Sequence, residues 1–432
     1  MGRPPNVVVV VLDTVRADRV SALGHDRETT PNFDAFAEEA TLFTDAVAQA
    51  PWSIPSQATL FTGQYPREHG ATIVRPVFDV PDPLPARLSA AGYATHAVSP
   101  NGYVRPATGF GRGFDTFERL SGVTAPDWLA TVVGPLVHGI TDSPFRRPVE
   151  GLFNAFRRRD ALTTDHTARP DDALVDTVKA KLASVRSPYF LFVNLLDCHL
   201  PRSPLPEYAT RFLDDKLRDI QLPSTERAHA LSDGPLGPRQ RRALCQLYDA
   251  DLRTMDDRLG RLLDVVERTD GETLTVLAAD HGEHLGEFGM IGHQYSVFEP
   301  AVSVPLAVQF PDGGPDRVDR QVELRRVFHT VLDETGVEAF PEQSLASGTG
   351  DDVAHGAFVS PMVDIERYLR DGEFTYETDL LGEPLSFVRD GDHKLVRFAD
   401  TEWFFTLPET DGKPADRDDA LSRLRAAQPS RL

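Results

Sequence analysis

The sequence predicts an α/β protein with a mostly parallel central sheet flanked by helices and a smaller C-terminal α+β subdomain. Continuous apolar runs such as Asn6–Leu12 and Tyr189–Leu196 are typical of parallel strands covered on both faces. Apolar residues at helical spacing separate these runs, most clearly along Gln240–Val266. Beyond about residue 345 the pattern changes to short runs divided by turns such as Asp390-Gly391-Asp392, which favours antiparallel strands.

Each element of the larger part is assigned from its own pattern. Helices are expected where apolar residues recur three or four apart, and strands where β-branched and aromatic residues run together. A glycine-rich loop is expected over Gly109–Phe117. The expected helices are Phe33–Ala40, Ser56–Phe61, Leu84–Ala91, Asp171–Val185 and Gln240–Val266, and the expected strands are Asn6–Leu12, Thr41–Val47, Tyr93–Ser99, Tyr189–Leu196, Leu274–Ala279 and Val304–Phe310.

The 432 residues are predicted to form two parts. Residues 1–344 make the catalytic α/β domain, with an insertion at about 120–170 that shows no clean periodicity, and residues 345–432 make the small subdomain. The expected elements of the subdomain are strands Ala357–Val363, Leu385–Val388, His393–Phe398 and Trp403–Leu407 and a short helix Asp418–Ala427.

The chain is strongly acidic, with a formal net charge of −21, and its basic residues are nearly all arginines. Dense carboxylates keep a surface hydrated in high salt, so the composition favours a halophilic protein, as in halophilic archaea, over a merely acidic mesophilic one. The same charge argues against nucleic acid or an anionic membrane as a partner. An anionic substrate would need a local positive charge, such as a metal ion.

Cysteine content and hydropathy indicate the compartment. Cys198 and Cys245 do not make a disulfide framework. The apolar run Val7–Leu12 is too short to span a membrane, and no basic, apolar leader begins the sequence. We therefore expect a cytoplasmic protein without a membrane segment; its oligomeric state cannot be predicted.

The stretch Pro51–Gly63 carries the first candidate for chemistry. Pro55 suits the first turn of a helix and Gly63 suits its end, which places Ser53 near a helix N-terminus. Free N–H groups and the helix dipole favour negative charge there. Ser53 is then either a nucleophile for an anionic ester or an ordinary N-cap, which is far commoner.

Residues of metal-ligand type follow three predicted strands. They are Asp13, the pair Asp197 and His199, and the pair Asp280 and His281. Each alone is explained as loop or N-cap chemistry. Because ligands of open α/β sheets bind beyond the carboxyl ends of the strands, their joint occurrence predicts a metal site.

Seven motifs in order resemble the sulfatase family, within the alkaline phosphatase superfamily. They cover the first three quarters of the chain, and a further stretch, Phe387–Phe398, is similar to the family's C-terminal subdomain. The motifs are Asn6–Asp18, Thr30–Ala40, Ser53–Gly70, Ala90–Ser99, Phe110–Phe117, Asn194–Pro201 and Ala279–Leu306.

The resemblance implies a catalytic site with one divalent metal ion. It implies Asp13, Ser53, Asp280 and His281 as ligands, and this oxygen-rich set suits Ca²⁺ or Mn²⁺, with Mg²⁺ or Zn²⁺ as alternatives. It also implies Ser53 as the nucleophile of a sulfate ester hydrolase. Two further groups are implied: His199 and His293 as candidates for the general acid, and Gln57 and Asn101 as substrate-binding residues.

The sequence departs from the family pattern at several places. Gln57 replaces the arginine of the signal that leads to formylglycine, so formylglycine at Ser53 is doubtful. Thr14 stands for a second acid, and His293 for a lysine. These departures resemble members with an unmodified Ser or Thr nucleophile, the phosphoglycerol transferase type.

Three classes of function therefore remain open. The first is hydrolysis of a small sulfate ester such as a sulfated glycan. The second is hydrolysis or transfer of a phosphate mono- or diester, including phosphorylated glycans, with a mutase-like isomerase as a weaker relative. The third is a non-catalytic binding protein that retains the fold.

Overall fold

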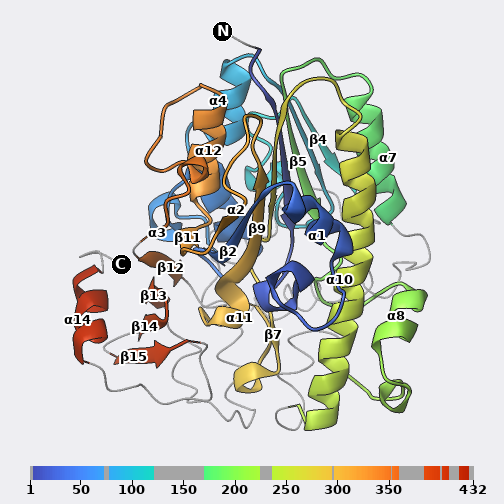
Figure 1. Cartoon of the computed structure of the whole chain (residues 1–432), viewed down its shortest axis with the longest axis vertical. Coiled ribbons are helices and arrows are strands. Elements are labelled where there is room, and N and C mark those ends of the chain that lie inside the picture. Colours follow the sequence, from blue (N-terminus) through green and yellow to red (C-terminus); the bar gives the residue numbers. More distant parts are fainter. Residues whose placement is uncertain are drawn as a thin grey trace, which may run out of the picture.

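A sheet of nine strands organises the chain (Figure 1). The computed structural model describes residues 3–72, 77–120, 170–223, 236–293, 296–351, 353–359, 384–398, 401–407 and 418–427. The strand order is β10-β2-β9-β6-β1-β5-β3-β4, and β11 also pairs with β2. The strands are β1 (Asn6–Leu12), β2 (Thr41–Val47), β3 (Ala94–Ser99), β4 (Thr116–Arg119), β5 (Tyr189–Leu195), β6 (Thr273–Ala278), β9 (Ser303–Gln309), β10 (Arg317–Val318) and β11 (Val322–Glu323).

The centre of the sheet is parallel, as predicted. Strand β1 lies between β5 and β6, with Val8 opposite both Leu191 and Thr275. The parallel arrangement continues through β3 to β4, whereas β9 runs antiparallel to both β6 and β2. The carboxyl ends of β1, β3, β5 and β6 consequently meet at one edge, where the sequence predicts the site.

Burial explains why β1 and β5 form the middle of the sheet. Every residue of the sequences NVVVVVL and YFLFVNL is buried. β-Branched and aromatic side chains suit a pleated surface, and each fully buried one contributes roughly 1.5–3 kcal/mol. Both faces of these strands are therefore covered.

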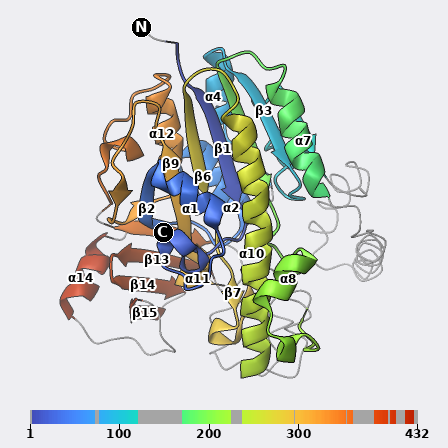
Figure 2. The ribbon, with the colours of Figure 1, turned by 45° about the vertical axis from the view of Figure 1, so that its right-hand side comes forward.

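Helices provide this cover in two packed sets. One set contains α1 (Pro31–Glu38), α7 (Pro170–Leu182), α8 (Pro206–Phe212) and α10 (Pro238–Val266), and the other contains α2 (Ser53–Thr62), α3 (Pro66–His69), α4 (Leu84–Ala90) and α12 (Arg326–Glu334). The long helix α10 runs the height of the molecule beside α7 and α8 (Figure 2). Its Asp256 accepts hydrogen bonds of 2.9 Å from the backbone N–H groups of Asn32 and Phe33 and so caps α1.

The C-terminal part contains a four-stranded antiparallel sheet in the order β12-β13-β14-β15. It contacts the larger part through charged residues that lie deep in the protein. Nζ of the fully buried Lys394 lies 2.8 Å from Oε1 of Glu299, and Nε of Arg389 lies 3.3 Å from Oε2. Glu299 begins the short helix α11. The elements are β12 (Ala354–Phe358), β13 (Leu385–Asp390), β14 (His393–Phe398), β15 (Thr401–Thr406), α14 (Asp418–Ala427) and α11 (Glu299–Val302).

The predicted elements agree with the structure except at two places. Residues Thr116–Arg119 pair with β3 as the edge strand β4, whereas the sequence predicts a loop to Phe117. All four residues of β4 are only half-buried, so no apolar run marks them. The strand expected at Ala357–Val363 lies at Ala354–Phe358, and its residues from 360 on fall outside the described residues. The predicted insertion lies almost wholly outside them too.

Among the described residues, no helix combines the length and the apolar character that crossing a bilayer requires. The domain boundary at residues 344 and 345 stays a prediction.

Candidate active site

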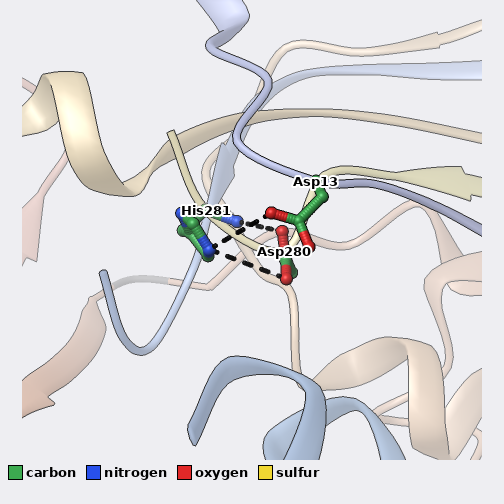
Figure 3. A group of neighbouring side chains, drawn as sticks. All are labelled: Asp13, Asp280 and His281. Atoms are coloured by element: carbon green, nitrogen blue, oxygen red, sulfur yellow. Dashed lines mark hydrogen bonds and ion pairs between the residues drawn. The ribbon is translucent and has the colours of Figure 1, made fainter. Parts of the chain in front are cut away.

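The acidic residues that follow β1 and β6 meet beyond the ends of these strands (Figure 3). Asp13, Asp280 and His281 have no solvent exposure, and their ligand atoms lie within 4.8 Å of one another. Nε2 of His281 lies 3.8 Å from Oδ1 of Asp13 and 3.7 Å from Oδ2 of Asp280. Nδ1 of His281 is hydrogen-bonded to the carbonyl oxygen of Gly282 at 3.0 Å, so Nδ1 carries the proton. The lone pair of Nε2 is therefore available to ligate a cation.

This cluster fits a divalent cation. Oδ1 of Asp13 is buried and has no hydrogen-bond partner among the described residues. The pKa of both carboxyls is raised to about 6, mainly by burial, and for Asp13 the charge of Asp280 contributes to this rise. Two buried carboxylates side by side are costly unless a positive charge compensates them. Their oxygens together with one imidazole nitrogen are donors that Ca²⁺, Mn²⁺ or Mg²⁺ accept.

Ser53 lies at the same place because helix α2 begins there. It is the first helical residue, the N-cap is Trp52, and no side chain caps the helix. The Ser53 hydroxyl oxygen instead lies 3.3 Å from Nε2 of His281 and 3.4 Å from Oδ2 of Asp13. Gly63 ends α2 with φ of 67°, and a Cβ there would clash with neighbouring side chains.

Asn101, which follows β3, lies at the cluster as well. Its Nδ2 donates to Oδ2 of Asp13 at 2.8 Å and to the Ser53 oxygen at 3.2 Å. Its Oδ1 accepts the backbone N–H groups of Tyr103 and Val104, which fixes the orientation of the amide. Asn101 is therefore positioned between the candidate nucleophile and a candidate metal ligand.

Gln57 lies one helical turn after Ser53 and is completely buried. Its Nε2 donates to Oδ2 of Asp280 at 2.7 Å and to Oδ1 of Asn194 at 3.0 Å. Both of its N–H groups are thus directed to residues of the site. The contact of Gln57 with substrate stays a prediction.

Thr14 occupies a turn that the neighbouring helix stabilises. Its φ of 62° is unusual for a β-branched residue. Its hydroxyl donates to the carbonyl oxygen of Asp13 at 2.7 Å, and Tyr248 of α10 donates to the Thr14 carbonyl oxygen at 2.7 Å. The Tyr248 oxygen also accepts the Arg16 N–H at 2.9 Å. This turn directs the Asp13 carboxylate at the site.

Two further histidines stand beside His281. The ring of His293 lies 4.4 Å from that of His281 and 5.1 Å from that of His199, between centroids. His293 is almost fully buried, and burial lowers its pKa well below the usual range, with the neighbouring histidines adding to this. His199 is half-buried, and its Nδ1 is hydrogen-bonded to the carbonyl oxygen of Leu200. Both predicted acid candidates are consequently adjacent to the candidate metal ligands.

The family is decided by comparison with known proteins. A family model described as Sulfatase matches residues 5–337, which is most of the chain. The chain belongs to the sulfatase family. Its fold agrees with this assignment.

Relatives of this sulfatase-family protein include proteins named as sulfatases. A protein named Sulfatase from Formosa agariphila is 26% identical over 79% of this chain and 71% of its own length. Mouse steryl-sulfatase is 27% identical over 87% of this chain and 67% of its own. These relatives and the family identify the chain as a sulfuric ester hydrolase.

Solved structures share the fold. The phosphonate monoester hydrolase of Agrobacterium radiobacter superposes with a TM-score of 0.71 at 21% identity, covering 98% of this chain and 94% of its own. A second protein, solved in complex with its substrate D-glucosamine-2-N,6-O-disulfate, superposes with a TM-score of 0.61 at 16% identity, covering 94% and 91%. The alkaline phosphatase-like fold is thereby confirmed.

One strand-end residue is not part of the cluster in this sulfatase-family protein. The carboxylate of Asp197 forms an ion pair with Arg258 of α10. It therefore does not join Asp13, Asp280 and His281 in the cluster. Of the three strand ends with residues of metal-ligand type, this one adds no carboxylate to the cluster, because the buried Arg258 pairs with Asp197.

Three residues near the site are not predicted by sequence reasoning. Asn194 is a polar residue within the apolar run of β5, and its Nδ2 lies 3.4 Å from Oδ2 of Asp13. Glu283 is fully buried, with Oε1 3.6 Å from Nδ1 of His293, and Arg202 forms an ion pair with it. A polar residue inside a buried strand is the sequence signal that identifies Asn194; no comparable signal marks Arg202.

A large cavity of about 830 Å³ lies elsewhere, between the sheet and the turn joining β13 to β14. None of the residues of the metal cluster lines it. The strand-end cluster is the better candidate for the chemistry, because a hydroxyl, two carboxylates and an imidazole converge there. The cavity lining includes Arg16, Asp45, Gln321, Arg389 and Asp392.

Proposed function

We propose that this protein is a metal-dependent sulfate ester hydrolase with Ser53 as its nucleophile. The supporting observation is the position of the Ser53 hydroxyl at the start of α2, within 3.4 Å of both Asp13 and His281. The substrate is a small anionic ester, and a sulfated glycan is favoured because a protein of the same fold binds a disulfated glucosamine.

Asp13, Asp280, His281 and Ser53 would hold the metal ion, with Ca²⁺ or Mn²⁺ preferred. When bound, the ion would neutralise charge on the ester oxygens and favour loss of the Ser53 proton. The Ser53 hydroxyl gives its proton to solvent water as its oxygen attacks the ester sulfur, and the bond between sulfur and the bridging oxygen breaks. His199 or His293 donates a proton to the leaving oxygen. Water finally cleaves the bond between sulfur and Ser53 and restores the hydroxyl.

Phosphate mono- or diester hydrolysis or transfer by unmodified Ser53 is the second candidate. The observation that favours it is Gln57, a neutral buried amide where the resemblance places an arginine. Without that arginine the signal for formylglycine is incomplete. Mass measurement of the peptide containing Ser53 separates the two chemistries: loss of two hydrogens means formylglycine, whereas intact serine excludes a formylglycine-dependent sulfatase.

The experiment is a panel of p-nitrophenyl sulfate, phosphate and phosphodiester assayed with Ca²⁺ or Mn²⁺ in high salt. We expect turnover of the sulfate ester that Ser53→Ala reduces by about three orders of magnitude, since nucleophile and metal contact are lost together. Turnover of phosphate esters alone would establish the second candidate. Thr59→Ala, on the same helix, is the control.

A non-catalytic binding protein is the remaining class. If the protein is of this class, added divalent ions should leave the melting temperature of the wild type unchanged. The melting temperature of Asp280→Ala should be equally insensitive to the ions. The proposed function predicts instead a rise of the melting temperature on metal addition that Asp280→Ala abolishes.

We also propose a cytoplasmic location and the two-part organisation with a boundary at 344 and 345. Cys198 and Cys245 are both free thiols, which suits a reducing compartment. The change from a mixed sheet to an antiparallel one supports the boundary.

A further inference from the structure

Two exposed apolar side chains lie on neighbouring segments near the site. Within the part of the chain that the structure describes, the large hydrophobic residues that are exposed are Val77, at 45%, and Tyr103, at 43%. Thr108 connects their segments. Its carbonyl oxygen accepts the N–H of Phe78 at 2.7 Å, and its hydroxyl donates to the Tyr103 carbonyl oxygen. Thr108 thus joins the segment that carries Val77 to the segment that carries Tyr103.

Tyr103 is tied to the candidate nucleophile by two separate routes. Its backbone N–H donates to Oδ1 of Asn101 at 2.8 Å, and Nδ2 of the same Asn101 lies 3.2 Å from the Ser53 oxygen. Its ring contacts Trp52, the residue before Ser53, edge-on, with centroids 6.4 Å apart and planes at 84°. Trp52 is only 4% exposed. The buried ring of Trp52, which directly precedes Ser53, thus supports the exposed ring of Tyr103.

We propose that Tyr103 is the platform against which the organic part of the ester packs. The substrate would then carry a ring with an apolar face, either an aryl group or a pyranose. This inference rests on the proposed function, because it assumes that the ester binds at Ser53. Aromatic rings attract other rings and apolar faces, whereas Asp13, Asn101 and His281, which lie next to the Ser53 hydroxyl, offer polar contacts.

Anion binding without turnover tests the platform directly. Calorimetry in Mn²⁺ compares phenylphosphonate with methylphosphonate, which share a headgroup and differ in the ring. We expect the wild type to bind phenylphosphonate about ten times more tightly, a size of effect consistent with one aromatic contact. Tyr103→Ala should remove this preference without changing methylphosphonate binding, and Tyr103→Phe should keep it.

Other results would overturn the platform. They are equal binding of the two anions by the wild type, absence of binding, or a phenyl preference that survives Tyr103→Ala. Tyr208→Ala, on helix α8, is the matched control and should retain the wild-type ratio.

Assays of ester turnover test this inference independently of the proposed function. They also distinguish an aryl substrate from a pyranose substrate. Tyr103→Ala should raise KM about tenfold and leave kcat within twofold of the wild-type value. This change is expected for p-nitrophenyl sulfate if the substrate ring is an aryl group, and for glucosamine 6-sulfate if the ring is a pyranose. A wild type that hydrolyses no ester but shows the phenyl preference would refute the function and keep the platform. Turnover that is insensitive to Tyr103→Ala would refute the platform alone.

Discussion

The side-chain amide of Gln57 donates a hydrogen bond of 2.7 Å to Oδ2 of Asp280, and neither residue has any solvent exposure. A neutral donor orients this carboxylate but leaves its negative charge uncompensated. An arginine at the same place would neutralise the charge that a cation needs. Gln57 is therefore suited to support a metal ligand, in addition to any contact with substrate.

Replacing Gln57 should weaken metal binding. Gln57→Ala is expected to lower the affinity for Mn²⁺ by about 10- to 100-fold, because residues that orient metal ligands have effects of this size. Calorimetric titration with Mn²⁺ measures it. Gln64→Ala, just beyond the same helix, is the control; equal affinities of Gln57→Ala and the wild type would contradict a supporting role.

The leaving group should distinguish the two histidines. The one that donates the proton becomes dispensable when the leaving oxygen is already acidic, as in p-nitrophenyl esters. We compare two single variants, His199→Asn and His293→Asn. We expect one of them, the variant that lacks the proton donor, to lower kcat about 100-fold for an alkyl ester and less than tenfold for the p-nitrophenyl ester. Parallel assays of the two esters provide the measurement, and equal losses on both esters for each variant would exclude both assignments.

Glu287 should make stability depend on pH in acid. Burial alone would raise its pKa, but Arg16, whose Nη1 lies 3.0 Å away, lowers it overall from 4.5 to about 2. Because the folded protein binds this proton less tightly than the unfolded chain, the stabilisation is complete above pH 4.5 and is lost as pH falls towards 2. The shift corresponds to about 3 kcal/mol.

Urea unfolding at pH 7 and pH 3 measures this contribution. Glu287→Gln should lower the free energy of unfolding at pH 7 more than at pH 3. Glu338→Gln, which removes an exposed partner of Arg87, serves as the comparison and should change little at either pH. If Glu287→Gln lowered the free energy of unfolding equally at pH 7 and pH 3, the lowered pKa of Glu287 would be contradicted.

Salt should stabilise the protein well beyond simple screening. The net charge is −21, and the Debye length has already fallen to about 3 Å at 1 M salt. If the acidic surface is an adaptation to high salt, the melting temperature should continue to rise between 1 M and 3 M KCl. A plateau near 1 M, recorded by thermal unfolding, would indicate an acidic protein without that adaptation.

The central strands and most of the site were predictable because their signals are local. The buried run of β1 and the polar residues directly after β1 and β6 predict both the sheet edge and the convergence of Asp13, Asp280 and His281. Strand β4 lacked a signal, since its position depends on pairing with β3.

The contacts of individual side chains were less predictable. Asp197 has the residue type and the location of a ligand, yet Arg258, which lies far along the chain in α10, determines its role. Arg202 contacts Glu283 through the same kind of long-range packing. Such partners depend on tertiary structure and leave no pattern within a short segment.

The pairing of β1 also has a consequence for biosynthesis. Val7 pairs with Phe190 and Asn6 pairs with Thr273, so the first strand made has both of its partners in the second third of the chain. Non-local pairing slows folding, and the N-terminal apolar run stays exposed until those strands are synthesised. Asp13 therefore meets His281 only late in translation. Metal binding would then report a completed catalytic domain, and a ribosome-bound fragment ending before residue 273 should depend on chaperones and bind no metal.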